Sequence, residues 1–127
     1  MYPRVANAAY RQANAAVAPT VALVRVYDEL IVAMTQAVRA MEEGKHETCF
    51  ARIQRVTNIL RGLDCALDFE RGGEIAERLH KVYNSYILQL HISYTRPDRI
   101  ARYRRLMDGL RSLREAWVQV ALEMRGG

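Results

Sequence analysis

The residues with which this chain could hold a metal ion are three histidines and two cysteines, with the carboxylates near them. His46, His80 and His91 lie far apart, and none stands beside a cysteine or carboxylate at the spacing of a known metal site. Glu77 and His80 have the spacing of the Glu-x-x-His unit of di-iron bundles, but the second unit and its facing glutamates are missing. The sequence therefore predicts no metal site and no cofactor.

Nucleophilic and phosphate chemistry have equally little support. Neither cysteine has a neighbouring histidine, and no serine stands in a nucleophile-elbow motif. Gly72–Gly73 lack the Lys-Ser/Thr pair that follows the glycines of a phosphate-binding loop. Small helical chorismate mutases hold a dicarboxylate with arginines and a lysine, but only Lys45 and Lys81 are present and no arginine falls on a core position. We expect a protein that is not an enzyme.

Positive charge is concentrated near the C-terminus. Between Arg96 and Arg114 there are seven arginines and two aspartates, which account for the whole net charge of +5. Such a segment indicates an acidic partner or a phosphate backbone, or else a solvated helix face. A basic helical module that binds nucleic acid is therefore the main alternative function, although no helix-turn-helix spacing and no second basic stripe accompany the segment. A purely structural, dimerising bundle is a further alternative.

Length and composition predict one cytoplasmic domain. The 127 residues suit a single hydrophobic core, and the longest apolar runs are far shorter than the roughly 20 residues of a membrane span. The N-terminus shows no secretory signal, and we expect no membrane insertion. Cys49 and Cys65 would lie about 24 Å apart on one helix, which excludes a disulfide between them. We expect both to be reduced, packed thiols.

Four segments carry apolar residues at the three- and four-residue spacing of a helix. The first opens at Pro19 and closes at Glu42 to Gly44, and its stripe consists of Leu23, Tyr27, Leu30, Met34, Ala37 and Met41. The second is expected to stop before Gly72 and Gly73, since two adjacent glycines end helices, and its stripe consists of Cys49, Ile53, Val56, Leu60, Leu63 and Leu67.

The third and fourth segments flank Pro97. The third runs from about Glu74 to Tyr94, with a stripe of Ile75, Leu79, Val82, Tyr86 and Leu90. The fourth keeps a heptad pattern through Tyr103, Leu106, Leu110, Leu113, Trp117, Val120 and Met124, where we expect Trp117 to pack in the core. Short connections between long helices predict an all-α, antiparallel up-and-down four-helix bundle over residues 19–127, preceded by a loosely structured N-terminal segment, residues 1–18.

Three blocks of the sequence, Pro19 to Ile31, Leu63 to Tyr86 and Leu113 to Trp117, resemble a known family, the flagellin export chaperones of the FliS family. Leu63 to Tyr86 (LDCALDFERGGEIAERLHKVYNSY) contains an intact Gly-Gly-Glu-Ile-Ala block after a leucine-aspartate helix end. Pro19 to Ile31 (PTVALVRVYDELI) is similar to a block in the family's first helix, and Leu113 to Trp117 is similar to the Leu-Arg-acid-x-Trp of the last. The departures are Glu29 where the family has glycine, Arg25 where it usually has an apolar residue, and Asn84-Ser85 where it tends to have Asp-Tyr.

The resemblance covers about residues 10 to 118 and implies a function. The protein would bind the disordered C-terminal segment of flagellin, prevent its premature polymerisation, and deliver it to a component of the flagellar type III export apparatus. The free protein could form a homodimer. A segment that becomes helical when bound needs an apolar groove on its chaperone.

Candidate flagellin-binding residues lie beside the predicted core stripes, in the N-terminal segment and, for Tyr27, on the stripe of the first helix itself. Several form a second apolar line in the first and third helices, for which a wide core face is the alternative interpretation. Tyr10 matches the family's N-terminal tyrosine segment, which can cover the site that flagellin would occupy, so residues 1–18 are a candidate removable cap. The candidates are Tyr10, Val24, Tyr27, Ile31, Val38, Ile87, Leu88 and Ile92.

Overall fold

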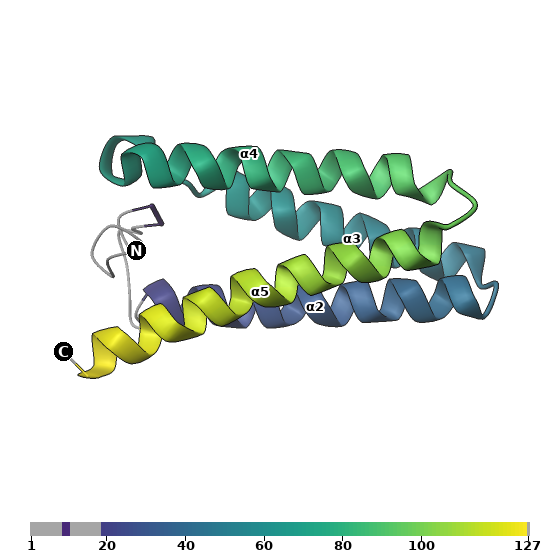
Figure 1. Cartoon of the computed structure of the whole chain (residues 1–127), viewed down its shortest axis with the longest axis horizontal. Helices are drawn as coiled ribbons and strands as arrows, with labels where there is room; N and C mark the ends of the chain where they lie inside the picture. The colour runs from purple at the N-terminus through teal and green to yellow at the C-terminus, as the bar shows by residue number, and fades with distance from the viewer. Residues whose placement is uncertain (1–8, 11–18, 127) are drawn as a thin grey trace.

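The computed structural model describes residues 9–10 and 19–126, and within these ranges it contains four helices and no strand. The helices are α2 (Pro19–Glu42), α3 (His46–Cys65), α4 (Phe69–Tyr94) and α5 (Arg99–Gly126). Each packs on the next along the chain, and α5 returns to pack on α2 (Figure 1). Successive helices run in opposite directions. The predicted antiparallel up-and-down four-helix bundle is therefore confirmed. Most of the predicted loose segment, residues 1–18, lies outside the described residues.

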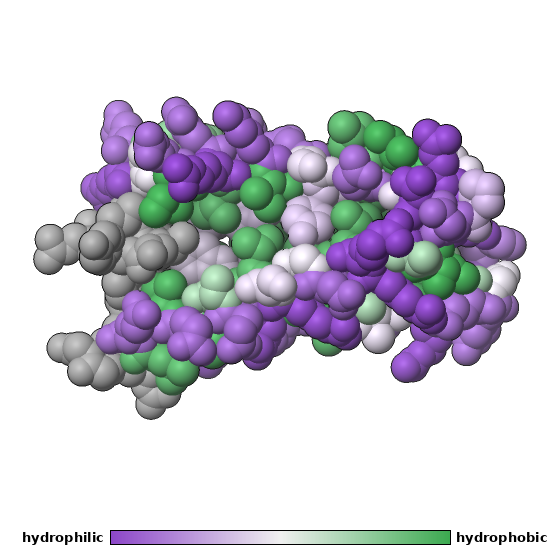
Figure 2. Space-filling view, in the orientation of Figure 1, coloured by the Kyte–Doolittle hydropathy of each residue, from purple (hydrophilic) through white to green (hydrophobic). Residues whose placement is uncertain are grey.

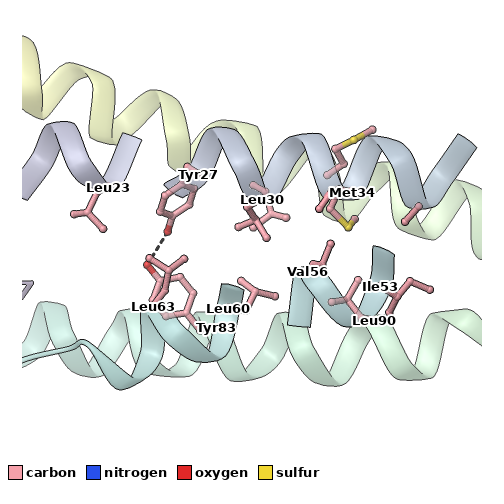
Figure 3. Packing of buried hydrophobic residues seen from close by; sticks show 14 of the residues in the cluster. Leu23, Tyr27, Leu30, Met34, Ile53, Val56, Leu60, Leu63, Tyr83 and Leu90 are labelled. Atoms are coloured by element: carbon pink, nitrogen blue, oxygen red, sulfur yellow. Dashed lines mark hydrogen bonds between the residues drawn. The ribbon is translucent and has the colours of Figure 1, made fainter. Parts of the chain in front are cut away.

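Helix α2 supplies the centre of the core. All six residues of its predicted stripe are buried, and Leu23, Tyr27 and Leu30 point toward α3 and α4 (Figure 3). Its C-terminus is closed by Gly44, whose positive φ of 70° lets two backbone N–H groups turn back onto the last carbonyls. Gly44 N–H donates to Met41 at 3.2 Å, and Lys45 N–H donates to Ala40 at 2.9 Å. The helix therefore ends where the sequence predicted.

The boundary between α3 and α4 differs from the prediction. Helix α3 ends at Cys65 rather than reaching Leu67, and α4 begins at Phe69, five residues before the expected start at Glu74. The reason is Asp68, whose side chain accepts a hydrogen bond from Arg71 N–H at 3.2 Å and so caps an additional first turn. The Gly-Gly pair does interrupt helical geometry, but as a kink inside α4, because Gly73 has φ 50° and ψ −125°.

The stripes of α4 and α5 are buried less completely than that of α2. In α4, Leu79 and Leu90 are buried, whereas Ile75, Val82 and Tyr86 keep part of their surface. In α5, the residues buried as predicted are Tyr103, Leu110, Trp117 and Val120, whereas Leu106 and Leu113 are only partly buried. The α4–α5 pair also makes the fewest contacts of the neighbouring helix pairs. One side of the bundle is therefore packed less closely.

The two cysteines both lie on α3 and are free. Cys49 is buried, as expected of a packed thiol, but Cys65 is exposed, so that part of the prediction is wrong. The cause is its place in the last turn of α3, just before the loop to α4. Among the described residues, no helix is long and apolar enough to cross a membrane.

The kink in α4 generates a test with a matched control. An alanine at Gly73 would meet no atom within 4 Å, but its backbone conformation is one that residues with a Cβ rarely adopt. We expect Gly73→Ala to lower the free energy of unfolding by about 1 to 3 kcal/mol.

Gly62→Ala is the control for this substitution. Gly62 lies within α3 and also has open space around its Cα, but its φ is not in the positive range. The exchange should raise the free energy of unfolding by about 0.5 to 1 kcal/mol. Urea unfolding of both variants measures the difference, and a Gly73→Ala variant as stable as Gly62→Ala would contradict the kink.

Candidate functional site

One end of the bundle is covered by Ala9 and Tyr10 of the N-terminal segment. They lie near the start of α4 and the C-terminal half of α5 (Figure 1), and both are buried. The carbonyl of Ala9 accepts a hydrogen bond from Asp68 N–H at 2.8 Å. A Cβ placed on Gly72 would lie 2.8 Å from Ala9 Cα, so only glycine lets the segment lie this close to the first turn of α4. The Gly72 of the Gly-Gly-Glu-Ile-Ala block thus has a packing role.

Tyr10 connects the N-terminal segment to three helices. Its hydroxyl donates to the hydroxyl of Tyr83 on α4, and Tyr83 shares a second hydrogen bond of 2.7 Å with Tyr27 on α2 (Figure 3). Its ring meets Trp117 of α5 edge-on, with the ring centroids 5.8 Å apart at 72°. Burial raises the pKa of all three tyrosines above their ordinary range, so the hydroxyls stay neutral. This neutral network holds Tyr10 over the core.

A polar cluster joins α3 to α4 beside this end of the bundle. His80 Nδ1 lies 2.7 Å from one carboxylate oxygen of Asp64, and Asn84 Nδ2 donates to the other at 3.3 Å. The ring of Phe69 lies edge-on to His80, with 5.7 Å between the ring centroids. The cluster fixes the register of the two helices and orients the first turn of α4. No group of three metal-ligating side chains occurs among the residues that the structure describes.

An ion pair joins α2 to α5 on the surface. Arg114 Nε donates to a carboxylate oxygen of Asp28. Asp28 follows Tyr27 in the block of the first helix, and Arg114 belongs to the Leu-Arg-Glu-Ala-Trp block of the last. Two of the blocks on which the family resemblance rests therefore meet in space, and both lie near the tyrosine network.

A groove of about 760 Å³ lies between α4 and α5. Figure 2 shows hydrophobic residues along the boundary of these helices, between two hydrophilic margins. Apolar and aromatic side chains within the groove come from the incompletely buried stripes: Val82, Tyr86, Leu106 and Leu113. Along α4 it extends from Lys81 to Ser93, which corresponds to about 18 Å or about three helical turns.

Small residues keep the groove open on both helices. Ser85 and Ser93 line it from α4, and Gly109 and Ser112 line it from α5. A Cβ on Gly109 would lie 2.1 Å from the hydroxyl oxygen of Tyr86, so the glycine makes room for this hydroxyl beside the α5 backbone. Short side chains at these positions let a further chain approach the two helices closely. The arrangement suits an amphipathic segment.

The candidate residues predicted from the sequence fall into three groups. Tyr10, Tyr27 and Val38 are buried, and Val24, Ile31 and Ile87 are partly buried against the core. Leu88 is 57% exposed and Ile92 is partly exposed. Only Tyr10 and Tyr27 are brought together, through Tyr83, and none of the eight lines the α4–α5 groove. Their role in binding stays a prediction.

The sequence interpretation missed the groove because it assigned the groove residues to the core. Val82 and Tyr86 belong to the stripe of the third predicted helix, and Leu106 and Leu113 to that of the fourth. The available signal was three small residues, Ser85, Gly109 and Ser112, which stand one or three residues away from these positions and cannot fill the space between two helices. Tyr83, the centre of the hydroxyl network, was missed as well.

Comparison with known proteins identifies the family of the chain. A family model described as "Flagellar protein FliS" matches residues 3–124, nearly the whole chain. No curated protein was found that matches the sequence. The resemblance noted from the three sequence blocks is therefore confirmed at the level of the family.

Proposed function

Because the chain belongs to the FliS family of flagellar proteins, a family of export chaperones, we propose that it binds the disordered C-terminal segment of flagellin. Binding in the cytoplasm prevents premature polymerisation, and the complex delivers flagellin to a component of the flagellar type III export apparatus. Chaperoning requires no catalytic group, and the family is not one of enzymes.

The α4–α5 groove is the observation that carries this proposal. A disordered segment that folds into an amphipathic helix must bury its apolar face to offset the loss of chain entropy. The groove offers four apolar or aromatic side chains over about three helical turns, and it lies between the least closely packed pair of neighbouring helices. A bound helix would complete the packing that α4 and α5 leave unfinished. The same apolar surface could support a homodimer of the free protein, which sedimentation with and without flagellin would detect.

The seat of Ala9 and Tyr10 supports a second element of the proposal, a removable cap formed by residues 1–18. The described part of this segment is attached to the bundle by the backbone hydrogen bond of Ala9, by the hydroxyl hydrogen bond of Tyr10 to Tyr83 and by the edge-on contact of the Tyr10 ring with Trp117. Its departure would uncover Tyr83 and Trp117, which are otherwise buried. Tyr10 and Tyr27 would then act at the end of the client-binding surface.

The arginine cluster favours this function over the nucleic-acid alternative. Several of its arginines are engaged within the protein: Arg102 pairs with Asp98, Arg104 with Glu42, Arg111 with Asp108 and Arg114 with Asp28, while Arg99 lies over the ring of Tyr94. Arginines that pair with carboxylates of the same protein contribute less to a phosphate-binding stripe. They join α5 to its own turn and to α2.

The direct test is calorimetry with flagellin and with flagellin that lacks its C-terminal segment. Full-length flagellin should bind in a one-to-one complex, with a negative heat-capacity change from the burial of apolar surface. The truncated protein should not bind. Equal binding of the two flagellins would contradict the proposal.

The cap is tested with two substitutions of Tyr10. Tyr10→Phe removes the hydrogen bond to Tyr83 but keeps the ring at Trp117, and Tyr10→Ala removes both contacts. Displacement of the cap consumes binding energy, so the flagellin segment should associate faster with Tyr10→Ala than with wild type, and at an intermediate rate with Tyr10→Phe. The fluorescence of Trp117, the only tryptophan, reports the reaction in a stopped-flow experiment. Slower association, or faster dissociation from both variants, would show that Tyr10 is part of the bound site.

A further inference from the structure

We infer that the α4–α5 groove selects an amphipathic helix that carries carboxylates on both sides of its apolar stripe. The inference rests on the proposed function, because the occupant it describes is the client segment. It adds that the client segment must carry carboxylates on both flanks, which an apolar groove alone would not require. The requirement comes from the charged residues at the groove margins.

Cationic side chains stand on both walls of the groove. Lys81 projects from α4, and Arg102 and Arg105 project from α5. Within the part of the chain that the structure describes, no aspartate or glutamate lines the groove. An occupant helix would therefore meet positive charge on each flank and no negative charge beside it. Acidic flanks are the complement of this surface.

The three cations differ in their engagement with the rest of the protein. Arg102 Nε already donates to Asp98 at 2.7 Å, across one turn of α5. Most arginines of the cluster form ion pairs within the protein. Lys81 and Arg105 are exposed, and neither takes part in an ion pair among the described residues. These two side chains are therefore available to a partner. Lys81 and Arg105 are therefore the residues that select for an acidic occupant.

The walls between these charges allow the occupant to come close. Ser85 and Ser112 line the groove with short side chains, and Gly109 lets the hydroxyl of Tyr86 lie against the α5 backbone instead of projecting into the groove. A helix seated this deeply would place its flanking residues level with the margins, within reach of a long lysine or arginine side chain. The apolar floor supplies the affinity, and the margins supply orientation and selectivity.

The test compares a groove variant with a variant of equal charge. Lys81→Gln with Arg105→Gln removes the two cations from the groove. Lys45→Gln with Arg52→Gln removes the other lysine of the chain and an exposed arginine of α3, neither of which lines the groove. All substituted positions are exposed, so both variants should fold, and circular dichroism checks this. Binding is measured by calorimetry at several salt concentrations on the full-length proteins.

Two probes are used with each protein. The first is the C-terminal segment of flagellin. The second is a pair of designed 18-residue amphipathic peptides with one common apolar stripe, which carry either glutamates or glutamines on both flanks. The groove variant should bind the flagellin segment and the glutamate peptide about three- to tenfold more weakly than wild type, with a smaller salt dependence. The control variant should match wild type, and the glutamine peptide should bind all three proteins equally.

The outcomes separate this inference from the proposed function. If the flagellin segment binds wild type, groove variant and control alike, with the same salt dependence, the inference is overturned and the chaperone function stands. If the flagellin segment binds none of them while the glutamate peptide binds and depends on Lys81 and Arg105, the groove has the inferred selectivity and flagellin is the wrong client. A glutamine peptide that binds wild type as tightly as the glutamate peptide overturns the inference.

Discussion

The closest packing in this bundle runs along α2, which lies between α3 and α5 and buries every residue of its apolar stripe. Helix α4 packs less closely on its two neighbours, α3 and α5, and it contacts α5 less than α3. Helices α4 and α5 both carry broad apolar stripes, but they do not pack on one another along the whole of these stripes. The groove and the exposed part of Val82 and Leu106 both depend on this unequal packing. A chaperone for an amphipathic segment needs such an incomplete core.

The tyrosine network sets how firmly the end of the bundle is closed. Tyr83 accepts a hydrogen bond from the hydroxyl of Tyr10 and shares another with Tyr27, so it would keep one partner if the proposed cap left the bundle. A buried hydroxyl that loses its only partner costs about 1 to 3 kcal/mol, and the second bond reduces this cost at Tyr83. The proposed uncovering of the core would therefore cost less than the loss of an only partner.

Much of the fold could be predicted because the stripes have a strong helical period and Pro19, Gly44 and Pro97 mark helix boundaries. The error at the α3–α4 boundary has a local cause. Two glycines ordinarily end a helix, but Asp68 caps a turn before them and Gly73 absorbs the change of direction. A capping aspartate followed within five residues by two glycines is a sequence pattern that also occurs in a loop between two helices.

The candidate site was harder to predict. Periodicity identifies the apolar stripe of a helix, but it does not show how much of that stripe a neighbouring helix buries. Leu106 and Leu113 follow the same heptad as Leu110 and Trp117, yet only the latter two are buried. The difference depends on the separation of α4 and α5, which is a tertiary property. Val38 shows the converse, because it lies on a second apolar line and is nevertheless covered.

The central claim is that flagellin occupies the space between α4 and α5, and photo-crosslinking tests it most directly. A benzophenone side chain introduced at Gln89 would lie in the groove, and one at Gln36 would lie on the exposed side of α2, away from it. The C-terminal segment of flagellin should crosslink to the protein substituted at Gln89 and not to the one substituted at Gln36. Crosslinking at Gln36 without crosslinking at Gln89 would contradict the account.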